Sequence, residues 1–399
     1  MQGLWFRKKK PKEYFETMDG KIDRHATWLE LFFDLVFVIA VSSLSDSLLS
    51  HVNFTSIGHF IFLFIPIWWI WMGISYYSDQ FEDNSILYRI MLFVSMLLTI
   101  RLSIFIPNVF LDSSRVFALI YIELRAVLII LYIAAWRRHP IQRPMIIRYI
   151  IGFSLDLLIW FVSVFVPDEF RFILWAIALC ISIATPIISY ITLETIPAQV
   201  SHMDERFGLF TLIVLGEIIL LVTRGIEHIA LSLHDTIHTF SGFCCAIVIW
   251  ALYFNYADDK VIHRSLRSGK KAIRKAFTYG YSHLFIFISI TAFGISYDAL
   301  AINGGILTPP LYLLIFGSAI LYILSITLIQ WAMGFHFTHI VLWTRIMAVI
   351  ALIVFSAPFS ATMPSYSVLR IAIVLVTMMI IERWHQLGNR QGEEGREQT

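Results

Sequence analysis

Residues 27–50 read TWLELFFDLVFVIAVSSLSDSLLS, and this stretch decides the class of fold. It is mostly apolar, and it is longer than the roughly 20 residues that an α-helix needs to cross a bilayer. It is also too long for a cleaved signal peptide, carries acidic residues and lacks a small-residue cleavage site. We therefore expect the first of a series of membrane-spanning helices here.

The composition of the whole chain agrees with this expectation. Of its 399 residues, 58% are hydrophobic and 15% are charged, whereas soluble domains are about 45–50% apolar and about 25% charged. A water-facing surface needs more polar side chains than this, which excludes a soluble enzyme. The net charge of +2 gives no field that would attract nucleic acid. The three cysteines form no C-x-x-C pair, so we predict neither a zinc site nor a disulfide framework, and we expect no cofactor.

Apolar stretches of spanning length recur along the chain. They predict an all-α, polytopic membrane protein with about twelve transmembrane helices. The expected spans lie near 27–50, 56–77, 86–106, 115–136, 145–166, 171–193, 206–224, 237–257, 277–299, 310–332, 338–358 and 365–384.

Lysine and arginine predict the orientation. They gather before the first span, around the loop after the fourth span, and in the basic loop 258–276. All three segments fall on one side of the membrane, which the positive-inside rule makes the cytoplasmic side. The even number of spans agrees. We expect a multi-pass protein of the inner (plasma) membrane with both termini in the cytoplasm.

Landmarks shared by the two halves indicate an internal duplication. At one offset, Trp71 matches Trp250 and Asp79 matches Asp258. Six spans in each half would insert in the same direction, so we predict two parallel six-helix repeats, an arrangement found in many secondary transporters. The expected divisions are a basic cytoplasmic N-terminal segment 1–26, a first repeat 27–193, a linker 194–205, a second repeat 206–384, and a disordered cytoplasmic tail 385–399.

Ionisable residues inside spans are costly and are therefore functional candidates. Glu30 and Asp34 are four residues apart in the first span, so they share one helix face. Such a pair can carry a proton or hold a cation, and the alternative is that each bonds a neighbouring helix or water. Glu217 lies near the middle of the seventh span between apolar residues. His283 in the ninth span can relay protons, or can be a hydrogen-bonded core residue. These four are the predicted coupling-ion residues.

Arg125 and Asp156 lie at the centres of the fourth and fifth spans. Their equal depth makes a buried ion pair possible, because a permanent guanidinium inside the membrane needs an acidic partner. A structural salt bridge and an arginine that grips the substrate are both open alternatives for this pair.

Four more charged residues lie near span ends. Glu205 and Arg206 open the seventh span, where helix capping and pairing with lipid headgroups would explain them. Asp79 and Arg89 flank the loop between the second and third spans. This loop is either solvated or a gate that pairs with the basic segments.

Two strings resemble signatures of a known family. Residues 28–38 (WLELFFDLVFV) resemble the opening motif of the low-temperature-requirement A (LtrA) family of bacterial membrane proteins. Residues 205–210 (ERFGLF), running on to Leu215-Gly216-Glu217, resemble its second signature. The Tyr-rich end of the second span and residues 281–284 also look like the family pattern. The resemblance covers nearly the whole chain in order. It implies a polytopic membrane protein named for a cold-growth requirement, and it implies no settled activity.

These observations favour a secondary transporter coupled to protons or sodium through intramembrane carboxylates. The expected partners are membrane lipids and a small solute or ion, with no nucleic acid. An intramembrane lipid-modifying enzyme is the runner-up, and a membrane stress sensor or receptor is a third alternative. No P-loop motif is present, which disfavours an ATP-driven pump. The substrate, the coupling ion, the direction of transport and the oligomeric state do not follow from the sequence.

Overall fold

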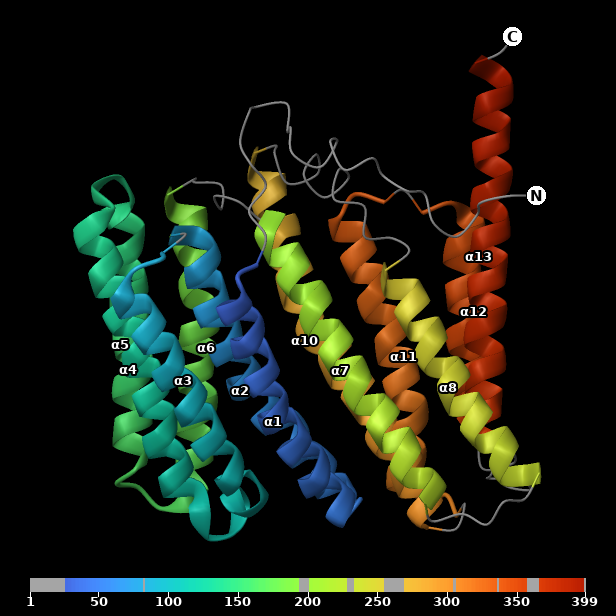
Figure 1. The fold of residues 1–399 in the computed structure, drawn as a ribbon, viewed down its shortest axis with the longest axis horizontal. Coiled ribbons are helices and arrows are strands. Elements are labelled where there is room, and N and C mark those ends of the chain that lie inside the picture. The colour runs from blue at the N-terminus through green and yellow to red at the C-terminus, as the bar shows by residue number, and fades with distance from the viewer. Residues whose placement is uncertain are drawn as a thin grey trace.

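The computed structural model describes residues 26–81, 83–193, 201–227, 233–254, 269–303, 306–335, 337–356 and 366–397. Within these ranges the chain is helical and contains no strand. Long helices stand side by side and run alternately up and down, in two sets that follow each other along the chain (Figure 1).

The first set holds six long helices. They are α1 (Trp28–Ser50), α2 (Phe54–Phe81), α3 (Ile86–Phe105), α4 (Ser114–Arg138), α5 (Arg143–Ser163) and α6 (Asp168–Leu193). Short helical turns, η1 (Ile106–Asn108) and η2 (Val109–Ser113), join α3 to α4, and η3 (Pro140–Gln142) precedes α5.

The second set also holds six long helices in its described residues. They are α7 (Ser201–Glu227), α8 (Leu233–Phe254), α10 (Gly269–Ile302), α11 (Pro309–Ala332), α12 (His339–Ser356) and α13 (Ser367–Glu397).

Nine segments of the described chain are long and apolar enough to cross a membrane. One of them, Ile86–Arg138, contains both α3 and α4. In α8 the apolar part is the shorter stretch Thr239–Phe254. The prediction of an all-helical, polytopic protein is therefore confirmed. The exact number of twelve spans stays a prediction.

Local sequence signals fix several helix ends. The Thr27 hydroxyl accepts a hydrogen bond from the Glu30 amide, and the Glu30 carboxylate accepts one from the Thr27 amide, which is the reciprocal capping box. Ser85 caps α3 by accepting from the Tyr88 amide. Gly334 follows α11 with a φ of 88°, the left-handed conformation that glycine adopts without strain and that ends many helices.

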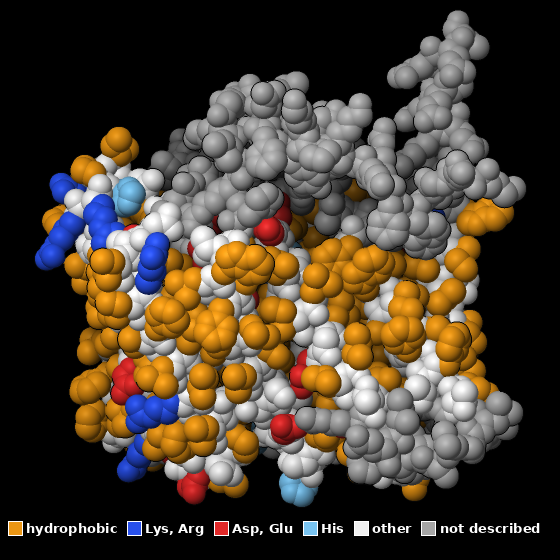
Figure 2. Space-filling view, in the orientation of Figure 1, with side chains coloured by type: hydrophobic (Ala, Val, Ile, Leu, Met, Phe, Trp, Pro, Cys, Tyr) orange, Lys and Arg blue, Asp and Glu red, His pale blue; other side chains and the backbone are white. Residues whose placement is uncertain are grey.

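The outer surface of the described helices is apolar. Large side chains such as Leu97, Ile151 and Ile353 are more than half exposed. Hydrophobic side chains form a broad band across the middle of the visible face, and many charged ones lie above or below it (Figure 2). A soluble protein would not expose so large an apolar patch, whereas lipid tails can cover it.

The two sets meet along α1, α2 and α6 on one side and α7, α10 and α11 on the other. α1 and α7, the first helices of the two sets, contact each other at the centre of the molecule (Figure 1). Residues far apart in the sequence therefore come together at this interface.

α13 continues to Glu397 and so extends through most of the segment 385–399 that the sequence predicted as a tail. Extending an existing helix is far less costly than starting a new one. The tail is also rich in Glu, Gln and Arg, which are good helix formers.

α5 and α6 pack closely at Gly152, where an added Cβ would clash with the side chain of Thr185. We expect Gly152→Val to destabilise the protein by about 1–3 kcal/mol, since overpacking forces side chains and backbone to shift. Thermal unfolding of the detergent-solubilised protein would show this as a lower Tm. Gly58→Val is the matched control, because a Cβ at Gly58 meets nothing within 4 Å. Equal Tm values for the two variants would contradict the close packing.

Candidate functional site

A buried ion pair joins the two helix sets. Asp34 on α1 has no exposed surface, and Arg206 on α7 is 3% exposed. The Arg206 guanidinium donates to the two carboxylate oxygens of Asp34 over 2.5 and 3.3 Å. The indole N–H of Trp71 on α2 donates to the same carboxylate over 2.8 Å. Three helices thus converge on one carboxylate.

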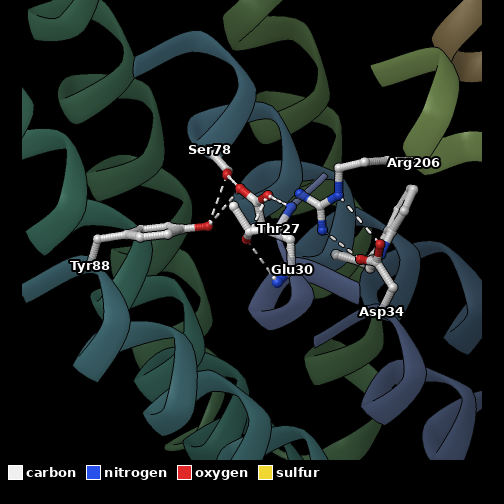
Figure 3. Close-up of polar contacts among 7 residues, drawn as sticks. Thr27, Glu30, Asp34, Ser78, Tyr88 and Arg206 are labelled. Carbon is white, nitrogen blue, oxygen red and sulfur yellow. Dashed lines mark hydrogen bonds and ion pairs between the residues drawn. The ribbon is translucent and has the colours of Figure 1, made fainter. Parts of the chain in front are cut away.

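Glu30 lies one helical turn before Asp34 and belongs to the same cluster. Its carboxylate accepts hydrogen bonds from Ser78 on α2 and, over 3.4 Å, from the hydroxyl of Tyr88 on α3. The Tyr88 hydroxyl also donates to Ser78 over 2.8 Å. In Figure 3, Arg206 reaches toward Asp34 while Glu30 lies beside it. We call Glu30, Asp34, Arg206, Trp71 and Ser78 the central polar cluster.

The interpretation of Arg206 as an interfacial residue that pairs with lipid headgroups is wrong. Its side chain is buried against α1 and α2, because Asp34 supplies the negative charge that a guanidinium needs inside the membrane. Glu205 is only partly buried, and it accepts a hydrogen bond from the Ala26 amide over 3.1 Å at the start of α1. The two neighbours therefore have different roles.

Glu217 lies on α7, three helical turns beyond Arg206, and is 6% exposed. Within the described residues its carboxyl group makes no hydrogen bond and no ion pair. On the neighbouring face of α7, a Cβ on Gly216 would meet nothing within 4 Å. A carboxyl group in this setting can take up a proton or a cation without first breaking a contact.

His283 on α10 is fully buried and uses both ring nitrogens. Its Nε2 and the Tyr253 hydroxyl on α8 are 2.8 Å apart, and its Nδ1 is 2.8 Å from the Tyr279 carbonyl. Its ring stacks on Phe207 with centroids 4.0 Å apart. These contacts fit a hydrogen-bonded core histidine, one of the two alternatives that the sequence left open.

Arg125 and Asp156 form the buried pair that their depth suggested. Arg125 Nε and Asp156 Oδ2 are 2.6 Å apart, and both side chains are at most 1% exposed. Arg125 also donates to the Ser182 hydroxyl on α6, which accepts a second hydrogen bond from Trp69 on α2 over 2.7 Å. The Phe153 ring lies 4.7 Å from the guanidinium carbon. This network ties α2, α4, α5 and α6 together.

Asp79 and Arg89, which flank the loop between α2 and α3, lie in different surroundings. Asp79 ends inside the protein at 8% exposure, whereas Arg89 is exposed on α3. Asp83 in the loop itself pairs with Arg138 on α4 over 2.7 Å. Burial pushes the pKa of Asp83 up, but hydrogen bonds from Ser85 and Tyr77 and the charge of Arg138 outweigh it, so the pKa lies below its ordinary value. The pair therefore stays ionised at neutral pH.

A pocket lies between the two helix sets. Its empty space is about 720 Å³, counted to its open mouth and including the solvent there. α2, α4, α5 and α6 line one side, and α7 and α10 line the other. Asp79 lines the pocket together with many aromatic side chains. Phe207, beside Arg206 in the chain, connects the pocket to the central polar cluster through its ring contact with Trp71.

The sequence did not single out several polar partners. Arg345 on α12 and Glu382 on α13 form a third buried ion pair, with Nε–Oε1 and Nη2–Oε2 distances of 2.7 and 3.0 Å. Both are charged residues within or at the edge of apolar runs, which is a signal that could have found them. Trp71 and Ser182 carry no such signal, because Trp and Ser are common in membrane helices. In the described part of the chain, no three His, Cys, Asp or Glu side chains come together as metal ligands.

Residues 25–381 match the family described as bacterial low temperature requirement A protein (LtrA). The chain belongs to this family. The match includes the central polar cluster, the Arg125–Asp156 pair and Glu217, so these sites lie within the family region. The family and the apolar helices together identify this LtrA-family chain as a multi-pass integral membrane protein.

One relative is an uncharacterized protein, RA0937, of Rhizobium meliloti (strain 1021). It is 25% identical over 280 residues, and the alignment covers 65% of each chain. No solved structure matches this chain.

The Asp34–Arg206 pair should behave as a strongly coupled unit. Asp34→Asn or Arg206→Gln alone leaves a buried charge without its partner, so we expect each to cost about 3–5 kcal/mol. The double variant should cost less than the sum of the two, by 1 kcal/mol or more, when unfolding of the purified protein is measured as a double-mutant cycle.

The control cycle uses Arg101 and Glu123, an ion pair 3.3 Å apart whose side chains are about half exposed. Both side chains are already half exposed, and Arg101 lies near the end of α3, where its long side chain can reach the membrane surface if Glu123 is lost. We therefore expect a smaller coupling energy than for Asp34 and Arg206. Equal coupling energies in the two cycles would mean that the Asp34–Arg206 pair stabilises the protein no more than the half-exposed Arg101–Glu123 pair does.

Proposed function

We propose that this protein is a secondary transporter coupled to protons or sodium, and that the pocket between the helix sets receives the substrate. One observation carries the proposal. The pocket is formed by both sets, and beside it the buried Asp34–Arg206 pair links the first helix of one set to the first helix of the other. Transporters built from two such sets bind substrate at the interface and move one set against the other.

The coupling would act on this ion pair. Asp34 and Arg206 attract each other only while Asp34 carries its charge. A proton or a cation delivered to the carboxylate weakens that attraction, and this favours separation of α1 from α7. Glu217 is buried on α7 and makes no hydrogen bond or ion pair within the described residues, so it is the candidate for receiving the coupling ion first. A movement of Glu217 on receiving the ion would be transmitted along α7, the helix that also carries Arg206.

The helix contacts support the two parallel six-helix repeats of this proposal. α1 packs against α2 and α3, and α7 packs in the same way against α8 and α10. Each set continues with a chain of neighbours, α3 to α6 in the first and α10 to α13 in the second. The residues that the duplication matches differ in burial, since Trp71 is fully buried and Trp250 is 45% exposed. Asp258, the match of Asp79, lies outside the described residues.

The orientation is part of the same proposal. The basic residues favour cytoplasmic termini in the plasma membrane. The pocket-lining residue Asp79 lies in the last turn of α2, and Ala276 lies near the start of α10. In this orientation both helix ends would face the cytoplasm. The pocket would then open toward the cytoplasm in the described conformation.

Glu217→Gln tests the coupling. The protein is reconstituted into liposomes with an imposed proton or sodium gradient, and uptake is followed over a panel of amines, amino acids, sugars, carboxylates and nucleosides. We expect the unaltered protein to accumulate at least one class, and Glu217→Gln to lose gradient-driven accumulation, because an amide cannot exchange a proton or balance a cation.

Glu123→Gln is the matched control, because Glu123 is a carboxylate in α4 that faces outward and pairs with Arg101. It should transport like the unaltered protein. Normal accumulation by Glu217→Gln would refute the role of Glu217. If no solute enters and added lipids are chemically altered instead, the protein is a lipid-modifying enzyme and the transporter proposal fails.

A further inference from the structure

The wall of the pocket is unusually aromatic. Nine of its sixteen lining residues are Phe, Tyr or Trp, one is the acid Asp79, and no Lys, Arg or His is among those described. The rings come from both helix sets, with Trp69 and Tyr76 on one side and Phe277 and Tyr281 on the other. A ligand in the pocket is therefore surrounded by π-systems.

Hydrogen bonds at their polar ends fix several of these rings. The Trp69 indole donates to Ser182, the Tyr281 hydroxyl donates to the Ile183 carbonyl over 3.1 Å, and the Tyr76 and Tyr190 hydroxyls are 3.1 Å apart. Their polar groups are thus occupied within the protein. Trp69, Tyr76 and Tyr281 therefore contact a ligand through their electron-rich rings, which attract cations.

Asp79 adds a negative charge to this wall at 8% exposure. Two arginines of α4 bind acids of their own: Arg138 binds Asp83, and Arg125 binds Asp156 behind the Phe153 ring. The Tyr132 hydroxyl makes no hydrogen bond within the described residues, so it can accept one from a donor in the pocket. The aromatic rings and the one acid of this wall favour a positively charged guest.

We propose that the pocket binds a small organic cation, an alkylammonium or quaternary ammonium compound. The aromatic rings enclose its alkyl groups and Asp79 balances its charge. This inference rests on the proposed function, because it names the substrate class of the same pocket. An inorganic cation would instead require a shell of oxygen ligands, which a wall made mostly of rings does not provide.

The test is equilibrium binding to the full-length purified protein, read from the fluorescence of its tryptophans or by calorimetry. The probe is choline. Its matched control is the neutral alcohol in which a tert-butyl group replaces the trimethylammonium group, because the two have nearly the same shape and differ in charge. We expect choline to bind at least about tenfold more tightly than the alcohol, a difference of about 1.4 kcal/mol.

Two variants locate the site. Asp79→Asn should weaken choline binding about tenfold and leave the alcohol unchanged. Phe277→Leu keeps an apolar side chain but removes a ring, so it should weaken choline binding several-fold, and Phe277→Tyr should restore it. Glu123→Gln, which removes a carboxylate far from the pocket wall, should bind choline normally. The comparison of choline with the alcohol needs no variant, so it holds even if a variant fails to fold.

Equal binding of choline and the alcohol, or no binding of choline, would overturn the cation proposal. Transport in liposomes separates this result from the proposed function. Choline binding without gradient-driven uptake would keep the cation site and refute the transporter. Coupled uptake of a sugar or a carboxylate, without choline binding, would keep the transporter and refute the cation site.

Discussion

The pairing of Asp34 with Arg206 is the contact on which the central part of this structure depends. Lipid tails are as apolar as leucine, so helices in a membrane gain little from hydrophobic burial against one another, and they associate through close packing and polar contacts. Here one carboxylate on α1 receives hydrogen bonds from α7 and α2. Because α1 opens the first helix set and α7 opens the second, this contact ties the two sets together at their first helices.

The same constraint explains the other buried charges. Arg125 and Arg345 each lie inside a set, and each is matched by an acid on the following helix of that set. A lone guanidinium in the bilayer would be too costly to keep, so each arginine determines which helix faces it. The pairs Arg125–Asp156 and Arg345–Glu382 therefore hold each set together internally. Asp34–Arg206 lies between the sets, where relative movement would break it.

Glu217 departs from this rule among the described residues, since it is buried in α7 without a bonded partner. Natural sequences retain such costly groups where function needs them. Arg206 lies on the same helix, and Phe207 of that helix lines the pocket. α7 therefore carries the buried carboxyl group, the arginine of the central ion pair and part of the pocket wall. A shift of α7 would therefore act on the carboxyl group, the central ion pair and the pocket together.

The sequence by itself determined the helical membrane fold, the approximate positions of the helices and the family. These follow from the length and apolarity of each segment, which are local properties that the bilayer reads directly. It also located Asp34, Glu217 and the Arg125–Asp156 pair, because a charge inside an apolar run stands out. It misjudged Arg206, and it gave no sign that Trp71 bonds Asp34 or that an aromatic pocket lies between the helix sets. Those depend on which faces of distant helices meet, and helix-to-helix contacts between residues about 170 positions apart are decided only when the tertiary structure packs α1, α2, α7 and α10 together.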